Sequence, residues 1–562
     1  MTAVLRIEQL EVWFNRQTAA RQRAVHDVSF SIQPGESLAL VGESGCGKST
    51  TALSVLRLLP HTAETRGRIV FDDVDLLALP LPELRAIRGR RIAMIFQDPM
   101  TSLNPVMTVG DQIVEVLRRL PGTTKAAAHK RAVELLDLVR IPDPHQRAHD
   151  YPHHLSGGQR QRAMIAMAVA CSPQLLIADE PTTALDATVQ AEIFELLDGL
   201  RKQLAMALLL ITHDLGVVAR WADRVVVMYG GETVEQSPVA DILARPHHDY
   251  TRGLIETSLH SGRGLHYSVA ALPEMQVTIS DTGQIQVIRR TATAQPPRAD
   301  SKSTSLLSAR DLRVEYTRHR RTFVALDGVS LDITRGETVG LVGESGCGKS
   351  TLSRTLLGLI KPVRGCVELT GQDILSASRA QLKQYRRDVR IVFQDPYASL
   401  NPRQTAGEIL DASLRAHGLD DAVSRRREIA HVLGRVGLPV AAAAKYPHEL
   451  SGGQRQRIGI ARALVLHPKL IVLDEPVSAL DVSTQAQILN LLVELKQQLG
   501  LSYLFVSHDL AVVRYMADRV VVMDSGKIVE TGAVDEVWDR PQSHHTRQLI
   551  AASLGRLSAT GV

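Results

Sequence analysis

The sequence predicts an α/β protein built from two tandem copies of one domain, each with a mostly parallel central sheet. Two observations lead to this fold class. The ten residues VGESGCGKST occur twice, at 41–50 and at 342–351. In both halves, short apolar runs rich in β-branched residues also alternate with helical stretches. Apolar runs of this length are typical of parallel strands that are buried on both faces.

In the first half, five apolar runs are the predicted strands and a longer amphipathic stretch is a predicted helix. The strands are SLALVG, RIAMIF, QLLIAD, ALLLIT and RVVVMY, and the helix is TVQAEIFELLDGLRKQL. The second half repeats this order. Because strands and helices alternate along the chain, we expect both faces of each central sheet to be buried by other elements.

The repeat extends far beyond the glycine-rich loops. The matched blocks are FQDPMTSLNP at 96–105 with FQDPYASLNP at 393–402, and YPHHLSGGQRQR at 151–162 with YPHELSGGQRQR at 446–457. From the second block onward, matched residues lie 295 positions apart, as Glu180 and Glu475 do. The repeating unit is therefore a whole domain. We expect domain 1 at 1–260, a linker at 261–305 and domain 2 at 306–562.

The linker differs in composition from the two domains. Residues 292–305 are polar and contain proline, which is typical of an exposed connection. Before them, MQVTISDTGQIQVI alternates apolar and polar residues around Asp281, Thr282 and Gly283. This pattern predicts a β-hairpin in which Gly283 occupies the turn position that needs a positive φ.

Composition and charge exclude several classes of protein. The net charge of +5 is spread along 562 residues, without the dense basic run and interleaved aromatics of a nucleic-acid interface. No apolar run approaches the roughly 18–20 residues that cross a bilayer, and the first residues do not have the pattern of a signal peptide. The four cysteines form no CxxC pair, so we expect free thiols in a reducing compartment.

Each ten-residue repeat contains a phosphate-binding loop. Both copies fit G-x-x-x-x-G-K-[ST], follow a predicted strand and precede a predicted helix. Backbone N–H groups of such a loop surround a phosphate, and the helix directs its positive end toward it. The nucleotide-binding residues that we expect are Gly42, Ser44, Gly45, Cys46, Gly47, Lys48, Ser49 and Thr50, and Gly343, Ser345, Gly346, Cys347, Gly348, Lys349, Ser350 and Thr351.

Within these loops, particular side chains have predictable roles. Lys48 and Lys349 would neutralise the charge of the β- and γ-phosphates, and Ser49 and Ser350 would bind Mg²⁺.

The cysteines of the loops, Cys46 and Cys347, lie beside the lysines at a helix N-terminus, a setting that lowers thiol pKa. We therefore expect a maleimide to inactivate ATP hydrolysis and MgATP to protect against it.

Two pairs of carboxylates follow predicted strands. LLIADE ends in Asp179 and Glu180, and LIVLDE ends in Asp474 and Glu475. The aspartates suit a contact with Mg²⁺. Each glutamate can orient and deprotonate a water that attacks the γ-phosphate.

The motif LSGGQ, at 155–159 and 450–454, decides the class of enzyme. With it, the chain resembles the ATP-binding subunit of an ABC transporter in which both nucleotide-binding domains are fused. The resemblance implies RecA-like cores, each with an antiparallel β subdomain and a helical subdomain. It also implies a head-to-tail pseudo-dimer of the two domains, in which the signature motif of one domain caps the ATP held by the other.

Further site residues follow from the same resemblance. The signature residues are Ser156, Gly157, Gly158 and Gln159, which would work with Lys349, and Ser451, Gly452, Gly453 and Gln454, which would work with Lys48. The Q-loop glutamines, which touch Mg²⁺ or the attacking water, are Gln97 and Gln394. The D-loop aspartates are Asp186 and Asp481, the switch histidines are His213 and His508, and the adenine-stacking aromatics are Phe14 and Tyr316.

The tails of the two domains indicate a branch of the family. RPHHDYTRGLI at 245–255 and RPQSHHTRQLI at 540–550, together with FQDPxxSLNP, resemble the dipeptide/oligopeptide/nickel importer group. The second tail has His545 where that group usually has tyrosine. The linker lacks the cysteine cluster that many members carry after the first domain, so we expect no iron–sulfur cluster.

The resemblance therefore implies an ATPase that powers uptake of short peptides or peptide-like solutes, with ATP and Mg²⁺ as cofactors. Its expected partners are two transmembrane permease subunits and an external solute-binding protein, not nucleic acid. Its expected location is the cytoplasmic face of the inner membrane, as a peripheral protein. An exporter ATPase and a soluble ABC ATPase acting on ribosomes or nucleic acid remain open, and so does the identity of the solute.

Overall fold

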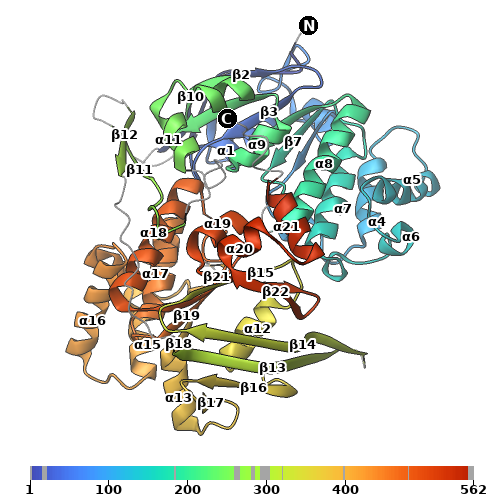
Figure 1. The fold of residues 1–562 in the computed structure, drawn as a ribbon. Helices are drawn as coiled ribbons and strands as arrows, with labels where there is room; N and C mark the ends of the chain where they lie inside the picture. Colours follow the sequence, from blue (N-terminus) through green and yellow to red (C-terminus); the bar gives the residue numbers. More distant parts are fainter. Residues whose placement is uncertain are drawn as a thin grey trace. The chain divides into compact units, whose positions relative to one another are not determined.

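The computed structural model describes residues 3–14, 22–182, 185–257, 266–279, 285–290, 304–318, 321–395, 399–478 and 480–554. The chain divides into two compact units (Figure 1). The first, domain 1, consists mainly of residues 1–261. The second, domain 2, consists mainly of residues 288–555 and also includes residues 262–276.

Domain 1 contains two sheets. The central sheet has the order β10-β9-β3-β8-β7-β6, with every pair parallel except β9 and β10. The strands of this sheet are β3 (Ser37–Val41), β6 (Ile92–Ile95), β7 (Leu175–Asp179), β8 (Ala207–Ile211), β9 (Arg224–Tyr229) and β10 (Glu232–Pro238). The second sheet is antiparallel, in the order β2-β1-β4-β5. Its strands are β1 (Leu5–Phe14), β2 (Gln22–Ile32), β4 (Glu64–Phe71) and β5 (Val74–Asp75).

The predicted parallel strands of domain 1 are confirmed. All five residues of β3, β7 and β8 are buried, as the unbroken apolar runs of the sequence require. One apolar core lies between the central sheet and the antiparallel sheet, and a second lies between the central sheet and the helices. The central sheet is therefore covered on both faces, and the loops that follow β3 and β7 start from this rigid sheet.

The helices of domain 1 include a cluster between the predicted Q-loop and signature motif. The helices are α1 (Lys48–Val55), α2 (Leu81–Ile87), α3 (Pro99–Ser102), α4 (Val109–Leu117), α5 (Lys125–Leu138), α6 (Pro144–Arg147), α7 (Gly157–Val169), α8 (Ala187–Leu204), α9 (Leu215–Trp221), α10 (Val239–Ala244) and α11 (Asp249–Thr257). Thr108 and Thr124 cap α4 and α5 by accepting backbone N–H bonds. These two helices begin the helical subdomain that the resemblance implied.

Domain 2 repeats this architecture. Its central sheet has the order β18-β19-β20-β15-β21-β22, and its antiparallel sheet has the order β14-β13-β16-β17. The strands are β13 (Ser305–Arg318), β14 (Arg321–Thr334), β15 (Thr338–Val342), β16 (Arg364–Leu369), β17 (Gln372–Asp373), β18 (Val389–Val392), β19 (Leu470–Asp474), β20 (Ser502–Val506), β21 (Arg519–Asp524) and β22 (Lys527–Ala533). The helices are α12 (Lys349–Leu356), α13 (Arg379–Asp388), α15 (Ala406–Ala416), α16 (Ala422–Arg435), α17 (Gly452–Leu464), α18 (Val482–Leu499), α19 (Leu510–Met516), α20 (Val534–Asp539) and α21 (His544–Leu554).

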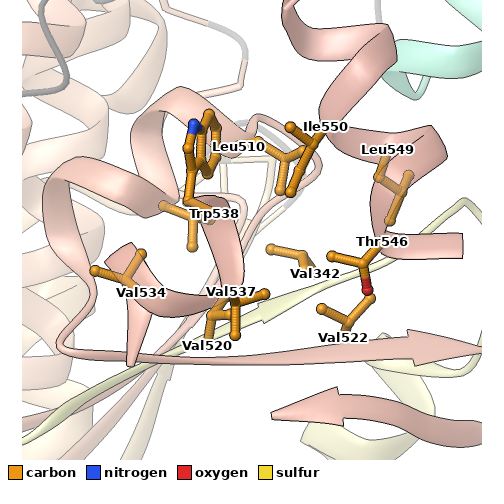
Figure 2. A pocket seen from close by; sticks show the side chains of 11 residues that line it. Val342, Leu510, Val520, Val522, Val534, Val537, Trp538, Thr546, Leu549 and Ile550 are labelled. Atoms are coloured by element: carbon orange, nitrogen blue, oxygen red, sulfur yellow. The ribbon is translucent and has the colours of Figure 1, made fainter. Parts of the chain in front are cut away.

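Residues 544–550 of the domain 2 tail motif lie in helix α21, which packs beside the central sheet. Figure 2 shows an apolar gap between this helix, α20 and the strand end at Val342. Trp538 and Ile550 are among the side chains that line it. Its open volume is about 20 Å³, so α21 covers this part of the core with little unfilled space.

The linker contains a two-stranded sheet at the position of the predicted hairpin. Its strands are β11 (Glu274–Ile279) and β12 (Ile285–Arg290). The predicted turn around Gly283 and residues 292–303 of the polar segment lie outside the described residues, and Ser305 at the end of that segment begins β13. Among the described residues, no helix combines the length and the apolar character needed to cross a membrane.

Candidate functional site

Each phosphate loop follows a buried parallel strand and closes against the neighbouring strand. Gly42 has φ 152°, and a Cβ at this position would lie 2.1 Å from the carbonyl oxygen of Met228. Gly343 has the same φ, and its Cβ would lie 2.3 Å from the oxygen of Met523. Only glycine fits such a close approach of two backbones. The first glycine of the motif is therefore required by the fold of the loop itself.

The lysine of each loop lies inside the loop. Lys48 is 6% exposed, and its Nζ donates to the carbonyl oxygens of Gly42 at 2.8 Å and Glu43 at 2.7 Å. Lys349 donates to the equivalent oxygens at 2.6 and 2.8 Å. The ammonium group is thus fixed where the loop curls, which suits a point charge that binds phosphate.

Helices α1 and α12 start at these lysines. Gly47 and Gly348 are the N-cap residues, with φ of 100° and 106°. A glycine N-cap has no side chain to accept from the N–H groups of the first turn, so these donors and the positive end of the helix can serve an anion. Both loops therefore have the geometry of a phosphate site.

The aspartates that end β7 and β19 lie in surroundings that disfavour their charge. Asp179 is 5% exposed, and burial raises its pKa to about 6, although the Ser49 hydroxyl that donates to it at 3.1 Å acts in the opposite direction. Burial and the neighbouring Glu475 likewise raise the pKa of Asp474. A carboxylate beside a serine hydroxyl is a set of hard oxygen ligands, which fits Mg²⁺.

The glutamates after these aspartates are held by two side chains each. Gln97 Nε2 donates to one carboxylate oxygen of Glu180 at 2.7 Å, and His213 Nδ1 lies 3.1 Å from the other. In domain 2, Gln394 and His508 hold Glu475 at the same 2.7 and 3.1 Å. The predicted Q-loop, acidic and switch residues of each domain therefore meet on one carboxylate.

The backbone of both glutamates is in a strained conformation. Glu180 has φ 44° and Glu475 has φ 47°, in the left-handed region that costs a non-glycine residue about 1–3 kcal/mol. Their N–H groups donate to Ile211 and Val506 on the neighbouring strands, both at 2.9 Å. The sheet thus fixes a backbone conformation that turns each glutamate toward its glutamine and histidine partners.

The charges of the glutamates and histidines support each other. Burial alone would lower the pKa of His213, but the hydrogen bond and negative charge of Glu180 outweigh it and raise that pKa. Burial alone would raise the pKa of Glu475, but the hydrogen bond and charge of His508 outweigh it and lower that pKa. Glu475 is therefore ionised near neutral pH and able to accept a proton.

The signature motifs lie at helix N-termini. Ser156 and Ser451 cap α7 and α17 in capping boxes, in which the serine N–H donates to the side-chain oxygen of Gln159 or Gln454. A Cβ on Gly158 would lie 2.7 Å from Val189, and one on Gly453 would lie 2.5 Å from Thr484. The second glycine of each motif therefore also allows the signature helix to pack closely on the next helix.

The predicted D-loop aspartates, Asp186 and Asp481, are the N-caps of α8 and α18. Each accepts a backbone N–H at 2.9 Å, from Val189 and Thr484. In each domain, the aspartate therefore begins the helix on which the signature helix packs.

The two predicted adenine-stacking residues differ in exposure. Tyr316 is 41% exposed, and its hydroxyl lies 3.5 Å from Thr351 Oγ1 in the first turn of α12. This position beside the phosphate loop fits a stacking platform. Phe14 is partly buried and packs against the core of domain 1.

The expected low pKa of the loop thiols is wrong. Cys46 and Cys347 are 4% and 5% exposed. Burial raises the pKa of both thiols and outweighs Lys48 and Lys349, which act in the opposite direction. Sequence spacing correctly placed the thiols beside the lysines but could not show that the loop closes over them.

The first tail motif also contacts a phosphate loop, which the sequence did not reveal. Tyr250 is fully buried, packs on Tyr229 with ring centroids 4.7 Å apart, and accepts from the N–H of Glu43 at 3.2 Å. Domain 2 has Asp524 and His545 at the positions of the two tyrosines. The difference at His545 was visible in the sequence, but its position beside the loop was not.

Replacement of Asp179 by asparagine should stabilise the nucleotide-free protein, and more so at pH 7.5 than at pH 5. A buried aspartate with a pKa of about 6 holds its proton in the folded state after the unfolded chain has released it. The wild type therefore loses stability as the pH rises through about 4 to 6, and asparagine does not. We expect the stability gain of Asp179→Asn to be about 1 kcal/mol larger at pH 7.5, measured by urea unfolding without Mg²⁺. An equal gain at both pH values would contradict the raised pKa.

The loop thiols should react slowly with a maleimide. The thiolate is the reacting species, and burial both limits access and raises the pKa. In the absence of nucleotide at pH 7, we expect Cys46 and Cys347 to be labelled at least about tenfold more slowly than the partly exposed Cys366. Peptide mass spectrometry over a time course measures the three rates, and loop cysteines that react first would refute this ordering.

Comparison with known proteins agrees with the geometry of both sites. The family model described as ABC transporter matches residues 25–183 and 326–478. The glutathione import ATP-binding protein GsiA of Pectobacterium atrosepticum is 45% identical over 559 residues, covering 98% of this chain and 89% of that protein. The GsiA of Escherichia coli K12 is 46% identical over 573 residues with the same coverage. The peptidoglycan transport ATP-binding protein YejF of Agrobacterium fabrum is 46% identical over 560 residues, covering 98% of this chain and 96% of that protein. The chain therefore belongs to the ABC transporter family, and it is an ATPase with two tandem ATP-binding domains.

Proposed function

We propose that the chain hydrolyses ATP to power the import of short peptides or peptide-like solutes through a membrane transporter. The relatives that match almost the whole chain are named for glutathione import and peptidoglycan transport. Glutathione is a tripeptide and peptidoglycan carries peptide stems, so the two solutes share peptide chemistry. One observation carries the catalytic part of the proposal: Glu180 and Glu475 accept equivalent side-chain hydrogen bonds in the two domains.

We further propose that ATP binds at two composite sites. In each site, the phosphate loop of one domain would hold the nucleotide and the signature helix of the other would face its γ-phosphate. The presence of both parts in both domains supports this arrangement. A serine hydroxyl and a helix N-terminus are suitable groups for sensing a phosphate.

In the proposed reaction, the residues of this chain position a water and accept its proton. Lys48 and Lys349 attract the phosphate oxygens. Glu180 and Glu475 accept the proton as the water oxygen attacks the γ-phosphate, and the phosphate–ADP bond breaks. Gln97 and His213, like their counterparts in domain 2, keep the carboxylate oriented toward this water.

A magnesium ion fits the residues beside each loop. Ser49 with Asp179, and Ser350 with Asp474, would hold it, and Gln97 and Gln394 would contact either the ion or the attacking water. When bound, the ion would neutralise charge on the phosphates. The hydrogen bond between Ser49 and Asp179 supports this assignment in domain 1.

The proposed partners are two transmembrane permease subunits and an external solute-binding protein. The chain would then act as a peripheral protein at the inner membrane. Import is favoured over export because the glutathione relatives are named import proteins. The ribosome-bound alternative has no such support.

The import function is tested by reconstitution with the permease pair and the binding protein in proteoliposomes. We expect ATP-dependent uptake of glutathione or a dipeptide to fall to the level without ATP when Glu180→Gln and Glu475→Gln are combined. Glutamine keeps the shape of the side chain but cannot accept the proton. Radiolabelled uptake and phosphate release are measured in the same vesicles.

The matched control is Glu195→Gln, a partly exposed carboxylate on α8 whose pair with Arg220 at 3.5 Å is of the weak surface kind. Uptake that persists in the double variant would contradict the proposal. Co-purification of the chain with ribosomes rather than membranes would favour the alternative that acts on ribosomes.

A further inference from the structure

On domain 2, residues 266–276 form a strap, which begins with a turn at 266–270 and continues into the first residues of β11. The strap belongs to the same compact unit as α17, α18 and α19 (Figure 1). Three of its side chains are almost fully buried: Tyr267 is 5% exposed, and Leu272 and Met275 are 2% exposed. Burial of this degree distinguishes the strap from a solvated connection.

The middle of the strap is held by an amide side chain of α18. Asn490 accepts from the N–H of Leu272 at 3.1 Å and donates to its carbonyl oxygen at 2.9 Å. Asn490 also donates to Glu274 at 2.9 Å, and the hydroxyl of Tyr515 donates to its Oδ1 at 2.9 Å. One asparagine thus satisfies both backbone groups of a strap residue, a pairing that needs a donor and an acceptor on the same side chain.

The start of the strap is held by an ionic pair. The Tyr267 hydroxyl donates to Asp518 and accepts from Lys496 Nζ at 2.8 Å. Lys496 also donates to Asp518 at 2.8 Å, and Asp518 accepts from the N–H of Thr338 at 2.7 Å. Thr338 is the first residue of β15, the strand that leads into the phosphate loop of domain 2. The strap therefore contacts the carboxylate that fixes the start of this strand.

The matching surface of domain 1 has different side chains. At the positions of Asn490 and Tyr515, domain 1 has Glu195 and Arg220, which pair with each other at 3.5 Å. An ionised glutamate has no donor for a backbone carbonyl. Domain 1 thus lacks the Asn490 and Tyr515 contacts at the matching positions, although Asp223 accepts from the N–H of Ser37 at 2.8 Å as Asp518 does from Thr338.

The signature helix of domain 2 also differs at a matched pair of positions. In domain 1, Arg162 on α7 pairs with Glu192 at 2.6 Å. In domain 2, Arg457 on α17 faces the neutral Gln487 at 3.5 Å. Burial lowers the pKa of Arg457, and the charge of Glu274 in the strap acts against this shift. Glu274 of the strap thus supplies to Arg457 the negative charge that Gln487, at the position of Glu192, does not.

We propose that the strap is a positioning element of the second ATPase domain and makes the two ATP sites functionally different. Its anchors lie on the elements that carry catalytic motifs. Helix α18 begins directly after Asp481, and α19 begins two residues after His508. Loss of the strap shifts these elements in domain 2 and leaves the equivalent elements of domain 1 in place.

The first test uses Asn490→Glu in the full chain, which installs the residue of domain 1. We expect hydrogen exchange at the backbone amide of Leu272 to become at least about tenfold faster, because its acceptor on Asn490 is displaced. Exchange at Tyr267, whose N–H donates to the carbonyl oxygen of Tyr515 at 3.0 Å, should also become faster as the strap is released. The matched control, Glu195→Gln, changes the equivalent position of domain 1 and should leave this exchange unchanged. Unchanged exchange in Asn490→Glu would show that Asn490 does not hold the strap.

The second test asks whether release of the strap acts on one ATP site. A photoreactive ATP analogue is cross-linked at subsaturating concentration, and the labelled peptides of the two phosphate loops are quantified by mass spectrometry. We expect Asn490→Glu to lower labelling of the loop around Lys349 at least about threefold relative to the loop around Lys48. The variant Tyr267→Phe, which removes only one hydroxyl, should lower the same ratio by a smaller factor and keeps the test valid if Asn490→Glu folds poorly.

Faster exchange of the strap with an unchanged labelling ratio would overturn the proposal, because the strap would then be only a tether. Equal loss of labelling at both loops would also overturn it. These measurements need neither a permease nor a solute. Their outcome is therefore independent of the proposed import function.

Discussion

The catalytic geometry of each domain depends on one interaction, the contact of a glutamine and a histidine with the carboxylate of a single glutamate. Glu180 and Glu475 each receive a glutamine on one oxygen and a histidine on the other. The three side chains come from three separate loops, each following a strand of the central sheet. The strained φ of the glutamate and its bond to the neighbouring strand make the sheet the support of this arrangement.

Much of the fold and of each site was predictable because it follows from local patterns. Apolar runs identified the buried parallel strands, and the glycine spacing identified the phosphate loops. Parallel strands bring their carboxyl ends to one edge, so motifs after β6, β7 and β8 had to meet. The contacts of Gln97 and His213 with Glu180 are the consequence.

The rest depended on contacts between distant residues. Burial of Cys46 depends on how the loop closes, so its thiol pKa rises although a lysine lies two residues away. The strap on domain 2 depends on Asn490 and Tyr515, which lie more than 200 positions after it in the sequence. Neither residue belongs to a motif. The two repeats differ at these positions in the sequence, but only the contacts in the structure show that this difference creates a binding surface for the strap.

The central claim is that the chain carries two working ATP sites, each dependent on its own glutamate. The most direct measurement is the number of nucleotides that the purified Glu180→Gln, Glu475→Gln double variant retains per chain with Mg²⁺. The account predicts two retained molecules, both as ATP, with no phosphate release. One retained nucleotide per chain, or phosphate release at the rate of the wild type, would contradict it.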